Sequence, residues 1–364
     1  MNTKFQKKIF YVSELNLISK SAYSIHVMKM CEAISKLGYK LELITTNSES
    51  SSKILNYYNI RNKFKITSVF KKKISLNFFL RILMSIKIIF KTHNEDCLYI
   101  TRSIIFGLIS ALLRKKTILE LHHEITGCSK LLYNLLIKLK KIDNLNYIFL
   151  HKNLKKIYRI RKSKIIILDD AVNIGDFNNN NSKKFKYTCI YVGSFFEGKG
   201  FEQILRLAKI NKKINFHVYG EKNFYGNDYS ILKNLKIFEH VPYKKIPRIL
   251  SQYDVALMPY QKKIKGRSSI QIEKYLSPLK MFDYMAAKLI ILASDLKIYK
   301  HILINNYNCK LIKLNNDMAW SLNLNNVFIN LNKYKYLKKN AFLTAKSYSW
   351  ENRVKLIFKK FKVS

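Results

Sequence analysis

The fold expected for this chain is most evident in YTCIYVGSFFEGKGFEQILRLAKI, residues 187–210. Its first residues form an apolar run typical of a buried strand, and residues from about 200 to 210 have the apolar spacing of an amphipathic helix. The loop between the two carries three glycines and Lys199. A strand followed by a short glycine-containing loop and a helix is typical of parallel α/β proteins. The segment therefore predicts a βαβ unit.

Strand-like and helix-like runs alternate over the rest of the chain as well. In the first half, KIFYV at 8–12 and LELITT at 41–46 read as strands, and residues 22–37 read as a helix that Gly38 ends. The polar, asparagine-rich segment 174–186 interrupts the pattern before it restarts. We therefore predict an α/β protein with two Rossmann-like, doubly wound parallel-sheet domains that face each other across a cleft, where ligands bind.

The composition argues against several classes of protein. Of the 364 residues, 48% are hydrophobic, which is ample for two packed cores and argues against a disordered chain. The five cysteines are far apart and form no CxxC pair, so we expect free thiols in a reducing cytoplasm and no metal site. The N-terminal residues lack the apolar core of a signal peptide. Of the most apolar windows, 76–90 contains Arg81 and Lys87 and 103–113 is too short, so we expect no membrane span.

The charge of the chain is strongly positive. Sixty-seven Lys and Arg residues against 23 Asp and Glu residues give a formal net charge of +44, which is typical of proteins that bind nucleic acid or anionic membranes. The basic runs, such as 71–73 and 114–116, are short and scattered, and they favour a solvated surface. We expect no nucleic-acid partner, and a basic nucleic-acid-binding protein is kept as the non-enzymatic alternative.

The glycine-containing loop GSFFEGKG at 193–200 suits a phosphate group. Backbone N–H groups at the start of the following helix and the ammonium of Lys199 would both face an anion, and glycine lets the backbone approach it closely. The loop is neither a P-loop nor a GxGxxG fingerprint. An ordinary β–α turn therefore explains it equally well.

The stretch SPLKMFDYMAA, which begins at Ser277, suits a nucleotide. Ser277 at the N-cap and Pro278 at the first helical position predict a helix start. The amides of Leu279 and Lys280 would point at a phosphate there. Asp283 follows one turn later, and its carboxylate can accept hydrogen bonds from a ribose diol. The alternative is a capped amphipathic helix with a solvated Asp283.

These motifs, together with several others, resemble those of a known enzyme family. The chain is similar to the family 4 type retaining glycosyltransferases (glycosyl transferases group 1), which have the GT-B fold. The motifs follow the family's order over nearly the full length: SIHVMKMCEAISKLGYKLELIT (24–45), LELHHE (119–124), LDDAVNIGDF (168–177), YVGSFFEGKGFEQIL (191–205), SPLKMFDYMAAKLIILASD (277–295) and YSWENR (348–353).

The resemblance implies a domain organisation. An acceptor-side domain is expected at 1–172, completed by a terminal helix at 349–364 that crosses back to it. A donor-binding domain is expected at 173–348.

On the donor side, the resemblance implies roles for particular residues. Lys199 matches the lysine that contacts the donor diphosphate. Leu279 and Lys280, directly after Ser277 and Pro278, match residues whose backbone amides meet the diphosphate.

The resemblance also implies contacts with the ribose and with the transferred sugar. Asp283 matches the second glutamate of the family's E-x7-E element, which binds the ribose. His122 matches the histidine that contacts the transferred sugar, and His123 is its immediate alternative. His26 lies in the helix start that, in the family, faces the donor phosphate and the acceptor.

Several positions depart from the family pattern. The arginine that usually follows the glycine of the donor loop is Ser194 here, and the first glutamate of E-x7-E is Tyr275. Arg267 or Lys280 is the candidate for the missing cation. These departures keep a catalytically inactive, glycosyltransferase-like protein as an alternative.

The resemblance implies an enzyme, a hexosyltransferase that moves a sugar from a nucleotide-diphosphate sugar to a surface-glycan or lipid-linked acceptor with retention at the anomeric carbon. The processes implied are lipopolysaccharide, capsule or exopolysaccharide biosynthesis. No cofactor and no metal are implied, because backbone amides and cations hold the diphosphate. A sugar-nucleotide 2-epimerase, which shares the architecture, is a further alternative.

Two basic, apolar helical segments favour a membrane surface. Residues 76–91 and 130–141 each combine large apolar side chains with several cations. Such helices bind anionic leaflets, although a helix that packs on a Rossmann-type sheet has a similar apolar stripe. We predict a cytoplasmic protein with peripheral contact to the inner face of the cytoplasmic membrane.

Overall fold

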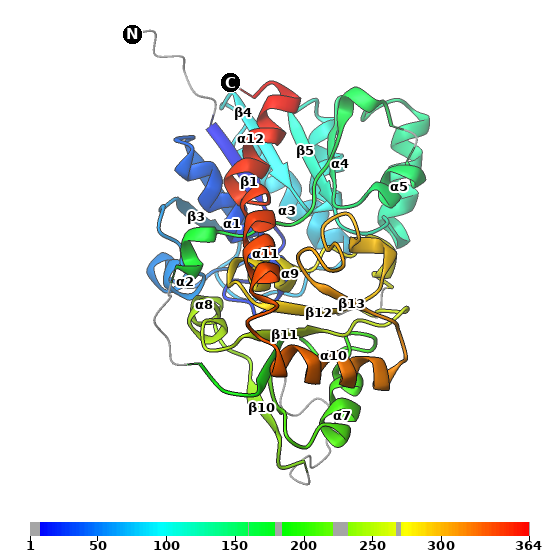
Figure 1. Cartoon of the computed structure of the whole chain (residues 1–364). Coiled ribbons are helices and arrows are strands. Elements are labelled where there is room, and N and C mark those ends of the chain that lie inside the picture. Colours follow the sequence, from blue (N-terminus) through cyan, green and yellow to red (C-terminus); the bar gives the residue numbers. More distant parts are fainter. Residues whose placement is uncertain (1–7, 159, 179–183, 221–231, 267–270, 364) are drawn as a thin grey trace. The chain divides into compact units, whose positions relative to one another are not determined.

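The computed structural model describes residues 8–158, 160–178, 184–220, 232–266 and 271–363. The chain divides into two compact units (Figure 1). The first unit contains Met1–Asp169 and Trp350–Ser364, and the second contains Asp170–Ser349. The boundaries expected from the family resemblance lie after residues 172 and 348.

The first unit is built on a sheet of seven parallel strands in the order β3-β2-β1-β4-β5-β6-β7. All are short, and all except the edge strand β3 are largely buried or apolar, as expected for strands that are covered on both faces. The strands are β1 (Lys8–Val12), β2 (Leu41–Thr45), β3 (Lys65–Ser68), β4 (Cys97–Thr101), β5 (Thr117–Leu121), β6 (Asn146–Phe149) and β7 (Ile165–Ile167).

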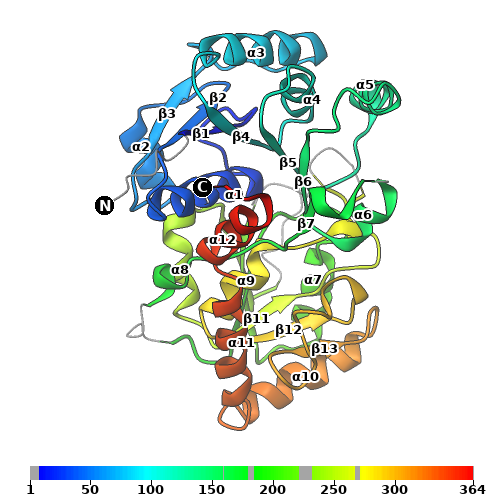
Figure 2. The ribbon, with the colours of Figure 1, turned by 90° about the horizontal axis from the view of Figure 1, so that it is seen from above.

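Helices cover both faces of this sheet. They are α1 (Ala22–Lys36), α2 (Ser51–Tyr57), α3 (Phe78–Lys91), α4 (Ile104–Leu112), α5 (Gly127–Lys138), α6 (Lys152–Ile157) and α12 (Trp350–Phe361). Figure 2 shows α3 and α4 on one side of the sheet and α1 and α12 together on the other. The core under α3 and α4 contains Phe10, Tyr99, Met84 and Phe106. The terminal helix α12 thus belongs to the first unit, although the second unit precedes it in the chain.

The second unit is built on a sheet of six parallel strands in the order β10-β9-β8-β11-β12-β13. The strands are β8 (Thr188–Val192), β9 (Asn215–Gly220), β10 (Leu235–Glu239), β11 (Val255–Met258), β12 (Ile290–Ser294) and β13 (Lys310–Ile312). Its helices are α7 (Phe201–Ile210), α8 (Ile246–Leu250), α9 (Leu279–Ala286), α10 (Asp317–Ile329) and α11 (Lys335–Ser347). The core between the sheet and α7 and α10 centres on the buried Trp320.

The helix start expected at Ser277 and Pro278 is displaced by one residue. Pro278 is itself the N-cap, with extended backbone angles (φ −80°, ψ 122°), and Leu279 is the first residue of α9. No side chain caps this end of the helix. The side chain of Ser277 turns instead to the start of the second unit, where its Oγ accepts a hydrogen bond from the Asp170 backbone N–H at 3.0 Å.

The order of strands reverses once in each sheet, between β1 and β4 and between β8 and β11. Sheets of this kind bind ligands in the crevice outside the carboxyl ends of the strands at such a reversal. These two places are therefore where functional side chains are to be sought.

Candidate active site

In the first unit, two histidines gather on one buried carboxylate near the carboxyl end of β5. Oε1 of Glu120 lies 2.7 Å from Nε2 of His122 and 3.0 Å from Nε2 of His26. Glu120 is in β5, His122 follows the strand directly, and His26 belongs to the first turns of α1. The two imidazole rings meet edge to face with their centres 4.8 Å apart. The strand end and the helix start together therefore bring both predicted histidines to one point.

The same carboxylate is bound by an arginine from the terminal helix. Nη2 of Arg353, in α12, lies 2.9 Å from Oε1 of Glu120, and its Nε donates to the Asp169 carbonyl at 2.9 Å. Arg353 and Glu120 are 3% and 1% exposed, so solvent hardly screens this pair. The Trp350 ring, one turn earlier in α12, lies 4.9 Å from the ring of His26. α12 therefore supplies both a charge and an aromatic wall to the cluster.

Charges in the cluster set its protonation. Burial alone would raise the pKa of Glu120, but the adjacent Arg353 and His26 outweigh it and hold that pKa well below its usual range. Burial, together with the positive charge of Arg102, lowers the pKa of His122 to about 3. At neutral pH the carboxylate is therefore ionised and His122 is uncharged.

His26, Glu120 and His122 are also a set of side chains that could hold a metal ion, since their ligand atoms lie within 4.8 Å of one another. The guanidinium of Arg353 is only 2.9 Å from the carboxylate oxygen that such an ion would use. A second cation beside it would be repelled in this buried place. The cluster therefore fits a hydrogen-bonded arrangement better than a metal centre, and the expectation of no metal stays a prediction.

In the second unit, the loop after β8 is shaped by its glycines. Gly198 and Gly200 have φ values of +79° and +94°, which favour glycine. A Cβ at Gly198 would lie 1.8 Å from the Lys263 carbonyl oxygen, and a Cβ at Gly200 would lie 2.2 Å from that of Pro259. The loop is thus packed against the segment that follows β11, at the reversal of strand order. Nζ of Lys199 donates to Oγ of Ser194 at 2.9 Å within this loop.

The ammonium nitrogen of Lys280, the second residue of α9, is buried against the same loop. This Nζ lies 3.6 Å from the centre of the Tyr191 ring and 5.3 Å from that of Tyr260. A Cβ on Gly193 would lie 2.4 Å from this nitrogen, so a side chain at that position would displace the lysine tip. Among the described residues, Nζ has no hydrogen-bond partner. Burial, reinforced by the charge of Lys199, lowers the pKa of Lys280 well below its usual value.

The other residues predicted for donor binding are found near the start of α9. Asp283 is buried, and its Oδ1 accepts a hydrogen bond from the Tyr243 hydroxyl at 2.8 Å. It is therefore not the solvated carboxylate of the alternative interpretation. Tyr275, at the position of the family's first glutamate, is buried in a short 3-10 turn before the helix. Arg267 lies outside the described residues.

Sequence reasoning missed some residues of these clusters. His123, the alternative to His122, stands apart from the carboxylate, with Nδ1 at 2.8 Å from the Glu124 carbonyl. The sequence predicts no role for Glu120, Arg353 or Tyr191. A signal exists for Arg353, because it shares the buried stripe of α12 with Trp350 and Val354. The roles of all the predicted site residues stay predictions.

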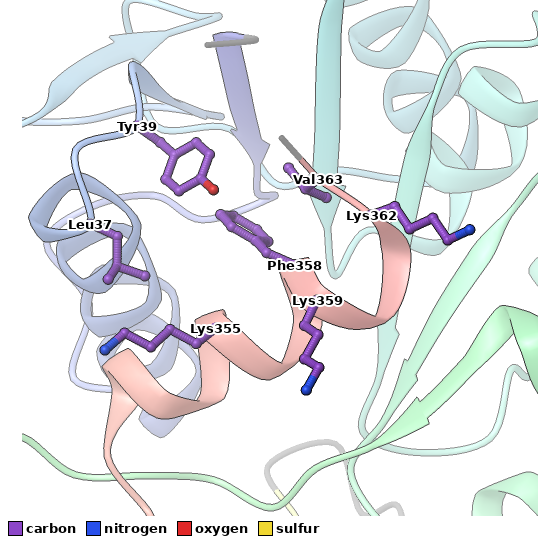
Figure 3. A pocket seen from close by; sticks show the side chains of 7 residues that line it. All are labelled: Leu37, Tyr39, Lys355, Phe358, Lys359, Lys362 and Val363. Carbon is purple, nitrogen blue, oxygen red and sulfur yellow. The ribbon is translucent and has the colours of Figure 1, made fainter. Parts of the chain in front are cut away.

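One pocket of the first unit lies away from these clusters. A cavity of about 480 Å³ between the end of α1 and α12 is lined by Leu37, Tyr39, Lys355, Phe358, Lys359, Lys362 and Val363 (Figure 3). The rings of Tyr39 and Phe358 meet edge to face, with their centres 4.7 Å apart. Figure 3 shows the three lysine ammonium groups pointing away from these rings. None of the predicted site residues lines this pocket.

Comparison with known proteins agrees with this architecture. Residues 174–344 match the family model of glycosyl transferases group 1. A glycosyltransferase from Rickettsia africae is 15% identical, with a TM-score of 0.74, over 99% of this chain and 100% of the other. HepE from Anabaena, solved with UDP and glucose, is 11% identical, with a TM-score of 0.70, over 97% and 100% of the two chains.

A third similar structure is S. aureus TarM, solved with fondaparinux, α-GlcNAc-glycerol and UDP. It is 12% identical, with a TM-score of 0.73, over 98% of this chain and 100% of the other. No curated protein sequence matches the chain. Similarity at these identities shows the fold, and the family match covers the second unit. The second unit thus matches the model of glycosyl transferases group 1, and the chain, with its two parallel α/β sheets, has the GT-B fold.

Proposed function

We propose that this protein is a glycosyltransferase that takes its sugar from a nucleotide-diphosphate donor held by the second unit. The observation that carries the proposal is the buried ammonium of Lys280, which has no hydrogen-bond partner among the described residues and is close enough to Lys199 for that charge to lower its pKa. Two cations brought together at the reversal of strand order are unfavourable unless an anion joins them. A diphosphate is the anion that fits this place, since it also meets the free amides at the start of α9.

The neighbouring residues suit the remainder of a nucleotide. The first N–H groups of α9, at Leu279 and Lys280, have no partner within the helix. Asp283 lies one turn later, and the Tyr243 hydroxyl holds its carboxylate in place. In our proposal the amides and the two lysines stabilise charge on the leaving diphosphate, and Asp283 binds the ribose. HepE and TarM, which share this fold, were solved with UDP, and this supports a nucleotide ligand.

The first unit supplies the sugar and acceptor side in this proposal. His122 contacts the transferred sugar, which is passed on with retention. Directly after His122 and His123 in the chain lies a pocket of about 370 Å³, lined by Glu124, Ile125, Lys130, Tyr133, Asn134, Ile137, Ile157 and Tyr158. Aromatic rings with a few polar groups suit a sugar ring. We propose a surface-glycan or lipid-linked acceptor, as in lipopolysaccharide, capsule or exopolysaccharide synthesis.

A ligand panel tests the donor part of the proposal. Thermal unfolding is measured with UDP, GDP, ADP and CMP and with their sugars. A ligand at 100 times its Kd raises the unfolding free energy by about 2.7 kcal/mol, and one of the diphosphates should do so. Lys199→Ala and Asp283→Ala should remove the shift, whereas Lys209→Ala, on the exposed face of α7, should keep it. A panel without any shift, or a shift that survives both site variants, contradicts the proposal.

Product analysis separates the remaining alternatives. A transferase releases the nucleoside diphosphate and forms a glycoside, whereas a 2-epimerase inverts a sugar centre. A catalytically inactive relative binds the donor and releases no product. The departures from the family pattern at Ser194 and Tyr275 are the reason for testing this alternative. Binding of duplex or single-stranded nucleic acid that falls steeply with salt would instead favour the nucleic-acid alternative.

We also propose that the first unit docks on an anionic membrane. α3 exposes Phe79, Leu83 and Phe90, which are 73%, 59% and 69% exposed, on the side opposite its buried Ile88. α4 joins α3 to α5, which exposes Leu131, and Figure 2 shows these three helices along one side of the unit. Lysines border the apolar side chains, so the surface combines the two attractions that hold a protein on an anionic leaflet.

No helix within the described part of the chain combines the length and the hydrophobicity needed to cross a bilayer. In the membrane contact that we propose, a surface helix lies on the inner leaflet. It would bring the acceptor side of the enzyme close to lipid-linked substrates.

A further inference from the structure

The hydrogen bonds around His122 define which of its ring nitrogens carries the proton. Nε2 of His122 is 2.7 Å from Oε1 of Glu120, and the same oxygen is 2.9 Å from Nη2 of Arg353. The guanidinium is always charged, and it keeps the carboxylate ionised. An ionised carboxylate only accepts hydrogen bonds, so Nε2 of His122 must be the donor.

The second nitrogen of the ring then has the opposite character. A neutral imidazole has a single N–H, and with the proton on Nε2 the Nδ1 atom has a lone pair. Within the part of the chain that the structure describes, Nδ1 of His122 has no hydrogen-bond partner, and the side chain is 13% exposed. The ring therefore offers an acceptor, and not a donor, to a bound molecule.

The charged groups that face His122 oppose a second proton. Arg353 reaches the shared carboxylate from α12, Arg102 follows β4, and the His26 ring from α1 meets the His122 ring at 4.8 Å. Glu120 is the only carboxylate among the described groups that act on His122, and Arg353 already offsets its charge. The nearby cations disfavour a second proton on His122, and the offset charge of Glu120 does little to favour one. The ring therefore stays neutral.

We infer that Glu120 and Arg353 are positioning residues that hold His122 as the Nε2–H tautomer, so that Nδ1 accepts a hydrogen bond from a hydroxyl of the transferred sugar. This inference rests on the proposed function, because it assigns His122 to the sugar. It names the chemistry that the site requires: the sugar must donate at that position. A donor in which fluorine replaces this hydroxyl can no longer do so.

The tautomer is tested without any substrate. In the protein labelled with ¹⁵N-histidine, the His122 signals are assigned by their loss in His122→Asn. We expect Nε2 to show the shift of a protonated nitrogen and Nδ1 that of an unprotonated one, unchanged between pH 8 and pH 5. A protonated Nδ1, or a titration within this range, overturns the inference whether or not the protein transfers sugar.

The role of the ion pair is tested by replacing both partners with apolar residues. Removing one partner alone would leave a buried charge, whereas Glu120→Leu with Arg353→Met keeps the volume without an uncompensated charge. We expect this double variant to stay folded, to show a mixture of His122 tautomers and to titrate nearer the usual pKa of histidine. Arg353→Lys alone should preserve the tautomer.

A matched control removes another buried ion pair from the same unit. Lys29 and Glu32, in α1, lie 3.0 Å apart and are 1% and 4% exposed. Lys29→Met with Glu32→Leu should leave the His122 signals and kcat unchanged. If this control disturbs them equally, the Glu120–Arg353 pair has only a structural role.

Kinetics with donor analogues complete the test. When each sugar hydroxyl in turn is replaced by fluorine, one position should lose about ten- to a hundredfold in kcat/KM, the value of one hydrogen bond that matters. His122→Ala should lose that discrimination between analogues. Equal rates for all analogues overturn the acceptor role of His122, while an absence of turnover with every donor contradicts the proposed function instead.

Discussion

The ammonium nitrogen of Lys280 lies 3.6 Å from the centre of the Tyr191 ring, and no described group forms a hydrogen bond to it. A cation over an aromatic face gains about 0.5–2 kcal/mol. Burial and the charge of Lys199 nevertheless lower the pKa of Lys280 well below its usual value. The protein thus keeps a cation in a place that disfavours it, as expected where a ligand supplies the counter-charge.

Replacing this lysine should therefore stabilise the ligand-free protein. We expect Lys280→Met to raise the free energy of unfolding by about 1–3 kcal/mol at pH 7, the range for an unsatisfied buried polar group. The folded pKa is lower than the unfolded one, so the unfolded chain binds more protons and the wild type gains stability as pH rises. In urea unfolding the advantage of the variant should shrink toward pH 10. A variant that is less stable at every pH contradicts this view.

Binding of a nucleoside diphosphate should draw protons from solution. An anion next to Lys280 raises its pKa, so the fraction of lysine that is neutral in the free protein becomes charged in the complex. Titration calorimetry of UDP, or of whichever diphosphate binds, should give enthalpies that vary with the ionisation enthalpy of the buffer. This variation should disappear in Lys280→Met and persist in Lys209→Met. Buffer-independent enthalpies in the wild type would count against a neutral Lys280.

Gly198 should tolerate no side chain. Its φ of +79° costs an alanine about 1–2 kcal/mol, and the added Cβ would lie 1.8 Å from the Lys263 carbonyl oxygen, which is backbone and cannot turn aside. In urea unfolding, Gly198→Ala should lose more stability than this backbone cost alone. The variant should also bind the donor less tightly. Gly38→Ala is the matched control, since Gly38 has a φ of +88° with no atom within 4 Å of the new Cβ. Equal losses in both variants would mean that the close approach is unimportant.

Membrane attachment should depend on the exposed phenylalanines of α3. Each buried Phe contributes about 1.5–3 kcal/mol, so Phe79→Ser with Phe90→Ser should weaken binding to anionic vesicles at least tenfold. Co-sedimentation with phosphatidylglycerol-containing vesicles, compared with phosphatidylcholine alone, measures this binding. Ile329→Ser, at a residue of α10 that is 71% exposed, should have no effect. Equal binding to both kinds of vesicle would exclude an anionic surface as the partner.

Local patterns in the sequence predict most of the fold. Apolar strands and amphipathic helices alternate visibly, and Gly38, with φ of +88°, ends α1 as the sequence indicates. The short helices α2 and α6 are not predicted, because a helix of about two turns shows little periodicity of apolar residues. The start of α9 is misjudged by one residue because the backbone of Pro278 is extended, so that it caps the helix and does not begin it.

The candidate site is predictable only in part, for a different reason. Lys199 and Lys280 are noticed because each lies in a recognisable strand–loop or loop–helix junction. Glu120 and Arg353 are 233 residues apart in the chain, and no local sequence pattern predicts that they pair. Their pairing follows from the placement of α12 on the first unit, which is a property of the tertiary structure. The residues next to Arg353 in the sequence do not predict that its side chain is buried in the site.

The position of α12 has a consequence for biosynthesis. The ribosome makes Glu120 early, but the arginine that neutralises it emerges only after the whole of the second unit. During translation the nascent first unit therefore holds a carboxylate without its cation, in a core that lacks one of its helices. We expect that unit to stay loosely packed, and dependent on chaperones, until translation reaches the residues of α12.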